Sequence, residues 1–198
     1  MLYLNKISGP NSEPVTVDDV KTYTHISHDV EDSLIAGWIK AARIAAEDYQ
    51  GRTYYTTVYD LTLDAWPVMP LQIPRPPLVS VDSFKYYDTA NVEYSFDLND
   101  IHVDTNAEPG RIALNYLVYW PTSIILRKID AIKIRFTAGY GDAGGTTTTP
   151  DYVVQLIPDS VKDAIYVYCA WRNENRAGET DIPKQFYDIL RPDRVKLC

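Results

Sequence analysis

The stretch Thr53–Trp66, TYYTTVYDLTLDAW, changes the periodicity of the chain and decides its fold class. From Tyr55 to Leu63 the large apolar side chains fall mostly on odd positions, and the even positions carry more polar residues. Alternation at period two is typical of a β-strand with one buried face. The segments before and after it have helical spacing, so the sequence predicts an α+β protein.

Two helices are expected before this strand. A short one follows Thr16, which suits an N-cap with Asp18 and Asp19 in the first turn, and runs to about residue 24. A longer one begins near Asp29 and ends at Gly51. Its predicted apolar stripe is Val30, Leu34, Trp38, Ala42, Ala45 or Ala46, and Tyr49, widened by Ile35 and Ile39. Its predicted polar face is Glu31, Asp32, Lys40, Arg43, Glu47 and Asp48.

The middle of the chain predicts a small, mainly antiparallel β-domain. Residues 66–77 hold five prolines, a density that no helix or central strand tolerates, so an extended segment along a sheet edge is expected. Further strands are expected at 79–88, 92–96, 101–103, 111–114 and 132–136.

Helical spacing returns near the C-terminus. After a loop rich in glycine and threonine, Pro158 opens a helix with the apolar stripe Val161, Ile165, Tyr168, and Trp171 or Arg172, beside Ala164 and Cys169. The final segment holds one amphipathic turn and an extended end after Pro192. We therefore predict N- and C-terminal helices that form a small bundle, with the β-domain inserted between them and an extended C-terminal segment. The expected ranges are 1–52 (N-terminal helical part), 53–136 (inserted β-domain), 137–150 (loop), 151–178 (C-terminal helix) and 179–198 (C-terminal arm).

Composition excludes several classes of protein. The 198 residues carry 19 basic and 27 acidic side chains, a formal net charge of −8, which disfavours a sequence-independent nucleic-acid clamp. No apolar run approaches the roughly 20 residues that span a bilayer. Residues 1–9 lack the basic and apolar regions of a signal peptide. The two cysteines, Cys169 and Cys198, form no paired motif, which fits a reducing compartment.

The sequence contains no recognisable metal-binding, phosphate-binding or catalytic motif. His25 and His28 fall at a helix junction with no third ligand nearby, and His102 stands apart from them, so no metal site is predicted. The segment Gly139–Gly145 lacks the lysine and hydroxyl of a phosphate loop. We expect no enzyme activity and no cofactor, with Cys169 as a core residue.

Sixteen tyrosines leave a second class of function open. A carbohydrate- or ligand-binding β-module would need exposed, coplanar rings, for which the candidates are Tyr86, Tyr87, Tyr116, Tyr119 and Trp120. A small hydrolase would need a concave pocket with two carboxylates within about 10 Å.

Several segments carry a more specific resemblance through their order along the chain. They are Ile73–Val81, Phe84–Asp88, Ile134–Asp142, Ile157–Pro158, Val161–Ile165 and Trp171–Arg176. Together with the helix at Val15–Val20 and the closing Leu190–Val195, this arrangement resembles the head–tail connector (adaptor) proteins of long-tailed bacteriophages, the larger members with a β-insertion. The resemblance covers nearly the whole chain and departs at the threonine run 146–149.

The resemblance implies a structural protein made in the host cytoplasm and located in the virion, at the head–tail interface. Such proteins form a homo-oligomeric ring, a dodecamer, under the portal protein. The ring extends the DNA channel, binds no particular DNA sequence and docks the stopper or tail-completion protein. For the portal contact it implies the C-terminal arm, with Phe186, Tyr187, Ile189, Leu190, Arg191, Arg194, Val195 and Leu197. For ring or neck contacts it implies Arg172, Arg176 and Tyr140.

Two of these implications agree with the residues themselves. An arm that buries little of its apolar surface alone becomes ordered on a partner, although it could instead pack back on its own domain. Net negative charge suits a channel through which DNA slides without being held.

Overall fold

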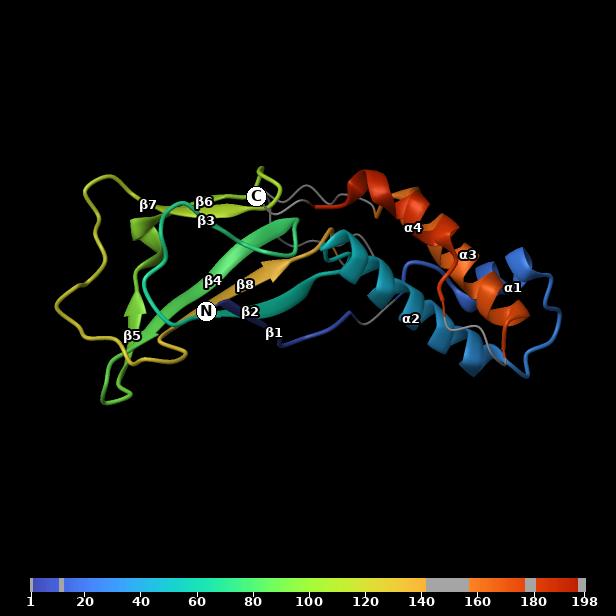
Figure 1. The fold of residues 1–198 in the computed structure, drawn as a ribbon, viewed down its shortest axis with the longest axis horizontal. Helices are drawn as coiled ribbons and strands as arrows, with labels where there is room; N and C mark the ends of the chain where they lie inside the picture. Colours follow the sequence, from blue (N-terminus) through green and yellow to red (C-terminus); the bar gives the residue numbers. More distant parts are fainter. Residues whose placement is uncertain (1, 11–12, 142–156, 177–180, 196–198) are drawn as a thin grey trace.

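The molecule is elongated, with its β-strands at one end and its helices at the other (Figure 1). The computed structural model describes residues 2–10, 13–141, 157–176 and 181–195. Within these residues the predicted α+β architecture is confirmed: helices from both ends of the chain pack together, and every strand except one at residues 2–6 lies between them in sequence.

The helices are α1 (Val17–Thr24), α2 (Asp32–Gln50), α3 (Asp159–Glu174) and α4 (Lys184–Leu190), with short 3-10 turns at Leu98–Asp100 and Arg191–Asp193. The predicted N-cap of α1 is confirmed as a capping box. Thr16 Oγ1 accepts the Asp19 N–H at 3.1 Å, and Asp19 Oδ2 accepts the Thr16 N–H at 3.0 Å. Gly51 ends α2 in the left-handed conformation, with φ of 69°.

The strands are β1 (Leu2–Lys6), β2 (Thr57–Leu63), β3 (Leu71–Gln72), β4 (Leu78–Tyr87), β5 (Glu93–Phe96), β6 (Ile101–Asp104), β7 (Arg111–Leu114) and β8 (Ile132–Ala138). Five of them form an antiparallel sheet in the order β1-β2-β8-β4-β5. The other three form a small antiparallel sheet in the order β3-β7-β6. The proline-rich segment contributes only the two-residue strand β3.

Strand β1 was not predicted, because residues 1–52 were all assigned to the helical part. It pairs with β2 over its whole length, with Leu4 opposite Leu61. Five residues leave too short a pattern to assign, and the pairing partner lies more than fifty residues further along the chain.

The chain has two hydrophobic cores. One lies in the helical bundle and contains side chains from all four helices together with Tyr54, Tyr55 and Tyr140. The other lies in the β-domain, around β2, β4 and β8. Gly139 follows directly after β8, where the chain leaves the sheet and runs toward the helical core. No side chain fits there, because a Cβ on Gly139 would lie 2.4 Å from the carbonyl carbon of Tyr55.

Most of the predicted stripe of α2 is buried, Trp38 included, and only its first two members are exposed. Ile35, Ile39, Ala42 and Ala46 are fully buried or nearly so. Leu34 is 45% exposed, and Val30 precedes the helix and is 88% exposed. The predicted polar face is also wrong in part: Arg43 and Glu47 are buried. They can be buried because they pair with each other, Arg43 Nη1 donating to Glu47 Oε2 at 2.8 Å.

The C-terminal arm packs back on its own domain through α4, the alternative left open by the sequence. Phe186 and Leu190 are completely buried in the helical core. Gln50 Nε2 donates to the Leu190 carbonyl at 2.8 Å, and the Val195 N–H donates to the Gln50 carbonyl at 2.9 Å. The expectation that this segment cannot bury its apolar side chains alone is therefore wrong for α4.

None of the helices in the described part of the chain is long and apolar enough to span a membrane.

Candidate interaction surfaces

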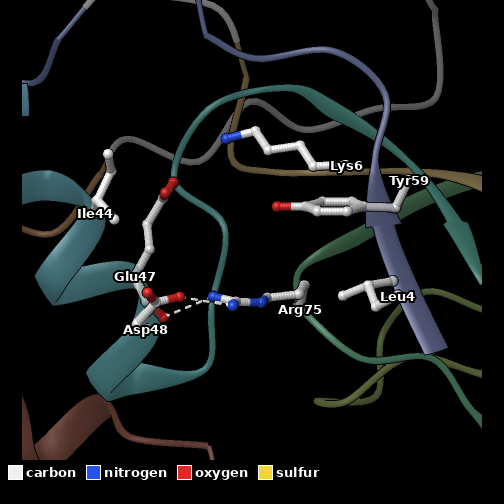
Figure 2. Close-up of a pocket in the computed structure, with 7 residues that line it drawn as sticks. All are labelled: Leu4, Lys6, Ile44, Glu47, Asp48, Tyr59 and Arg75. Carbon is white, nitrogen blue, oxygen red and sulfur yellow. Dashed lines mark hydrogen bonds and ion pairs between the residues drawn. The ribbon is translucent and has the colours of Figure 1, made fainter. Parts of the chain in front are cut away.

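A cavity of about 270 Å³ lies where α2 meets the sheet, and its lining includes two carboxylates, so it is a candidate catalytic or binding site (Figure 2). Its lining comes from β1, α2, β2 and the proline-rich segment: Leu4, Lys6, Ile44, Glu47, Asp48, Tyr59 and Arg75. Figure 2 shows the Arg75 side chain reaching across to the carboxylate of Asp48.

The two carboxylates of this cavity are both engaged by guanidinium groups. Arg75 Nη2 donates to Asp48 Oδ1 at 2.7 Å, and Arg43 donates to Glu47. Glu47 Oε1 also accepts the backbone N–H of Tyr54 at 3.0 Å. Both carboxylates therefore already accept hydrogen bonds from the protein itself, so neither is presented free to a substrate in the cavity. The cavity gives no support to the hydrolase hypothesis.

Arg43 is the centre of a buried ionic network. Its Nε and Nη2 donate to Glu13 at 2.6 and 3.3 Å, besides the bond to Glu47. Burial disfavours the charged guanidinium, but the hydrogen bond to Glu13 and the charge of Glu47 outweigh it, so the pKa of Arg43 lies above its ordinary value. The network fixes the segment before α1 against α2.

A second cavity, of about 340 Å³, continues along the same side of α2 and shares Lys6 and Ile44 with the first. It is lined by Lys6, Gly9, Pro10, Glu13, Lys40, Arg43 and Ile44. Lys6 and Lys40 form no ion pair with the residues that the structure describes. Through these shared residues the two cavities form a groove beside α2, and it holds two lysines that have no ion pair in the described part of this acidic protein.

The residues implied in portal binding have two different environments. Phe186 and Leu190 are buried, and Tyr187 and Ile189 are half-buried, with the Tyr187 ring 4.9 Å from that of Tyr49. Arg191 and Arg194 are exposed, Val195 is half-buried, and Leu197 lies outside the described residues. The Arg194 guanidinium lies 5.0 Å from the centre of the Tyr49 ring.

The structure does not bring together the three residues implied in ring or neck contacts. Tyr140 is buried, and its hydroxyl accepts a 3.2 Å hydrogen bond from Arg52, so its side chain presents no free surface. Arg176 is exposed and binds the Glu31 carboxylate through both terminal nitrogens, which raises the pKa of Arg176 and lowers that of Glu31. Arg172 is half-exposed near Trp171.

The five candidate rings of a ligand-binding module do not form a platform. Tyr86 is buried and stacks on Tyr94, and Trp120 stacks on Trp66 with centroids 4.7 Å apart. Tyr87 is half-buried beneath Arg127. Tyr116 and Tyr119 are 91% and 78% exposed, but neither belongs to a ring pair within the described residues.

Those two tyrosines belong to a larger exposed apolar set that the sequence analysis missed. The loop between β7 and β8, at the end of the molecule far from the helices (Figure 1), exposes Tyr116, Leu117, Tyr119, Ile125 and Ile129. Trp120, Ile124 and Leu126 of the same loop pack on the β-domain core. The only available signal is a concentration of apolar residues in a segment with neither helical nor strand periodicity.

Histidine and cysteine add no site. Among the described residues no cluster of three or more histidine, cysteine, aspartate or glutamate side chains could hold a metal ion. Cys169 is buried in the helical core as predicted, and burial raises its pKa to about 12. Cys198 and most of the 137–150 loop lie outside the described residues.

Comparison with known proteins is informative only at the level of structure. No protein-family profile matches the sequence, and a search of curated proteins gives no match. A chain in the virion of a native gene transfer agent particle superposes with a TM-score of 0.75 and 19% identity, covering 98% of this chain and 96% of that one. The same fold occurs in particle necks.

Two neck structures carry that observation. One is the neck of an empty gene transfer agent particle computed with C6 symmetry, which matches with a TM-score of 0.71 and 18% identity. The other is the neck of the native particle computed with C12 symmetry, with a TM-score of 0.71 and 19% identity. Each match covers 99% of this chain and 97% of the other. At this identity the likeness shows a common fold over the whole chain.

Proposed function

We propose that this protein is a structural component of the neck of a phage-like particle, a head–tail connector that acts without catalysis. The observation that carries the proposal is the fold match to neck and virion chains over 98–99% of this chain. The bundle, the inserted β-domain and the C-terminal helix are all included in that match. The order of sequence segments, which resembles the connector family, supports the same role independently.

In this role the chain forms a ring of twelve copies under the portal, extends the DNA channel and docks the stopper or tail-completion protein. The C12 symmetry used for a neck of the same fold supports the copy number. The elongated shape, with helices at one end and an apolar loop at the other, supports contacts with more than one component of the particle.

The portal contact is assigned to the accessible part of the C-terminal arm. Because Phe186 and Leu190 are part of the chain's own core, their role is to hold α4 in place. Arg191 and Arg194 are exposed and can pair with acidic groups of the portal, and the segment that follows them completes the arm.

The proposal is tested on particles rather than on the isolated chain. DNA-filled heads are sedimented from the source culture, and quantitative mass spectrometry measures the ratio of this chain to the portal subunit. A fixed ratio near one to one is expected for two matched rings. Absence of the chain from every intact particle would overturn the proposal.

A further inference from the structure

Helices α2 and α3 pack face to face, so their remaining faces point away from each other. The buried side chains of α2 include Ile35, Ile39 and Ala42, and those of α3 include Val161 and Ile165, all in one core. Residues about half a helical turn away from these lie on the opposite sides of the two helices. Figure 1 shows α2 along one side of the helical bundle and α3 and α4 along the other side of the bundle.

The outward face of α2 is apolar with a positive charge, and it adjoins the groove described above. We call it the outer α2 face; it consists of Leu34, Gly37, Lys40, Ala41 and Ile44, all exposed. Leu34 and Ile44 are 45% and 43% exposed, so two large aliphatic side chains lie on this face with Gly37 and Ala41 between them.

The outward face of α3 has the opposite charge. We call it the outer α3 face; it consists of Asp163, Val167, Ala170 and Glu174, spaced at helical intervals. The two acidic side chains are exposed and the two apolar ones half-exposed. Within the described residues neither Asp163 nor Glu174 forms an ion pair.

We propose that the outer α2 face of one copy packs against the outer α3 face of the next copy, with Lys40 near an acidic side chain of that α3. The inference rests on the proposed ring and names the surface that builds it. Two different faces on opposite sides of one bundle give a heterologous, head-to-tail contact, which closes into a ring when the rotation between copies allows.

Charge and shape both favour a second copy as the occupant. The outer α2 face and its groove carry Lys6 and Lys40, for which the described residues supply no ion pair, whereas the outer α3 face carries only negative charge. Gly37 and Ala41 face Val167 and Ala170 in this arrangement, and side chains of that size let two helices approach to the usual 8–10 Å between axes. A contact between copies also agrees with the C12 symmetry used for a neck of the same fold.

Cysteine cross-linking in assembled particles tests the contact. In a Cys198→Ser background, Ala41→Cys and Ala170→Cys are introduced together, and particles that carry the variant are oxidised. The double variant is expected to give a ladder of disulfide-linked oligomers on a non-reducing gel. Either single variant should give none, because a heterologous contact does not place identical residues opposite each other. Cys169 stays silent because it is buried.

Charge reversal gives a second, independent readout. Lys40→Glu is expected to lower incorporation of the chain into particles about tenfold, as the loss of one close charge pair and its replacement by repulsion imply. Asp163→Lys or Glu174→Lys in the same chain should restore incorporation. Circular dichroism of each purified variant checks that it folds, which is expected since all three positions are exposed.

The outcomes separate this inference from the proposed function. If the chain is present in particles at the portal ratio but the double variant gives no ladder and Lys40→Glu is incorporated normally, the interface is wrong and the neck role stands. Dimers from a single cysteine variant would also overturn it, since they indicate a two-fold contact. Absence of the unmodified chain from particles overturns both.

Discussion

At the scale of single residues, the helical end of the molecule depends on a buried ion pair. Arg43 and Glu47 are 2% and 5% exposed, and the sequence placed both on a solvated face. An arginine or glutamate on a helix is nearly always solvent-exposed unless it is paired, so residue type alone predicts the wrong environment. What reverses it here is the spacing of four, which lets the pair satisfy itself, together with Glu13 from a segment thirty residues earlier.

Removing one partner of this buried ion pair is expected to lower the free energy of unfolding far more than a substitution at an exposed position does. Arg43→Met leaves the buried Glu47 carboxylate without its cation, so the free energy of unfolding should fall by about 3 kcal/mol. Lys40→Met, on the exposed side of the same helix, should change it by less than about 0.5 kcal/mol. Urea denaturation of the purified chain measures both.

A double variant then distinguishes charge from packing. Arg43→Met with Glu47→Gln removes both charges but keeps an oxygen that accepts the Tyr54 N–H. It should recover most of the lost stability. If the double variant is as unstable as Arg43→Met alone, the cost came from lost packing around the guanidinium and not from an unpaired carboxylate.

Acid sensitivity is expected from a carboxyl group in the sheet. Asp60 on β2 accepts hydrogen bonds from Arg135 on β8 at 2.8 and 3.0 Å, and this partner lowers the pKa of Asp60 below its ordinary 3.8. The stabilisation is fully present above the unfolded-state pKa and is lost as the pH falls from about 4 toward the lowered folded-state value.

Asp60→Asn should therefore be less stable than the natural chain near neutral pH, and the difference should shrink below about pH 4. Thermal unfolding across this pH range measures the effect. Asp188→Asn, which removes an exposed carboxyl group on α4, is the control variant and is measured over the same pH range. A pH-independent deficit for Asp60→Asn would show that the ion pair is not its cause.

At the scale of elements, local pattern identified most of the fold, and long-range pairing accounts for what it missed. The alternation in Ile132–Phe136 and the cap at Thr16 were enough to place β8 and α1. Strand β1 was not predicted because it is recognised only by its pairing with β2, which lies far away in the sequence. The C-terminal arm was expected to bury little of its apolar surface on its own domain. Its contacts there, between the Phe186 and Tyr168 rings and between Gln50 and the Leu190 carbonyl, join segments that are not adjacent in sequence.

Candidate contact residues were harder to predict than elements, for a related physical reason. A resemblance to a family indicates where a residue stands along the chain. Whether that residue can contact a partner depends on its solvent exposure, which the resemblance does not give. Tyr140 and Phe186 were expected to meet partners, and both are buried in the chain's own core. The exposed apolar loop between β7 and β8 lacked any periodic signal, so Leu117 and Ile129 were missed.

The role of α4 as part of the folded bundle gives a prediction of its own. Phe186→Ala is expected to lower the free energy of unfolding by about 3 kcal/mol or more, because it leaves a cavity among Tyr168, Tyr187 and their neighbours. Ile189→Ala, at a half-buried position on the same helix, should cost clearly less. Denaturant titration with tryptophan fluorescence compares them. Equal and small losses would mean that α4 is not docked in the isolated chain.

At the scale of the whole molecule, the distribution of charge bears on what passes through the proposed ring. The chain has 27 acidic and 19 basic side chains, and many of its arginines are already paired: Arg43, Arg52, Arg75, Arg111, Arg135 and Arg176. Counterion release from DNA needs free cations gathered on one surface, and these six arginines are engaged by carboxylates of the same chain. Lys6 and Lys40, for which the described residues supply no ion pair, lie in the groove that the neighbouring copy is inferred to cover.

We therefore expect no retention of double-stranded DNA by the purified chain even at about 50 mM salt, where non-specific binding is strongest. Electrophoretic mobility shift with DNA of unrelated sequences measures this, and a basic DNA-binding protein of similar size is the positive control. Retention that weakens steeply as salt is raised would reveal a cationic surface in the isolated chain. If Lys6→Glu and Lys40→Glu then abolished that retention, the groove would be the DNA site, and the surface assigned to the next copy would have to be reassigned.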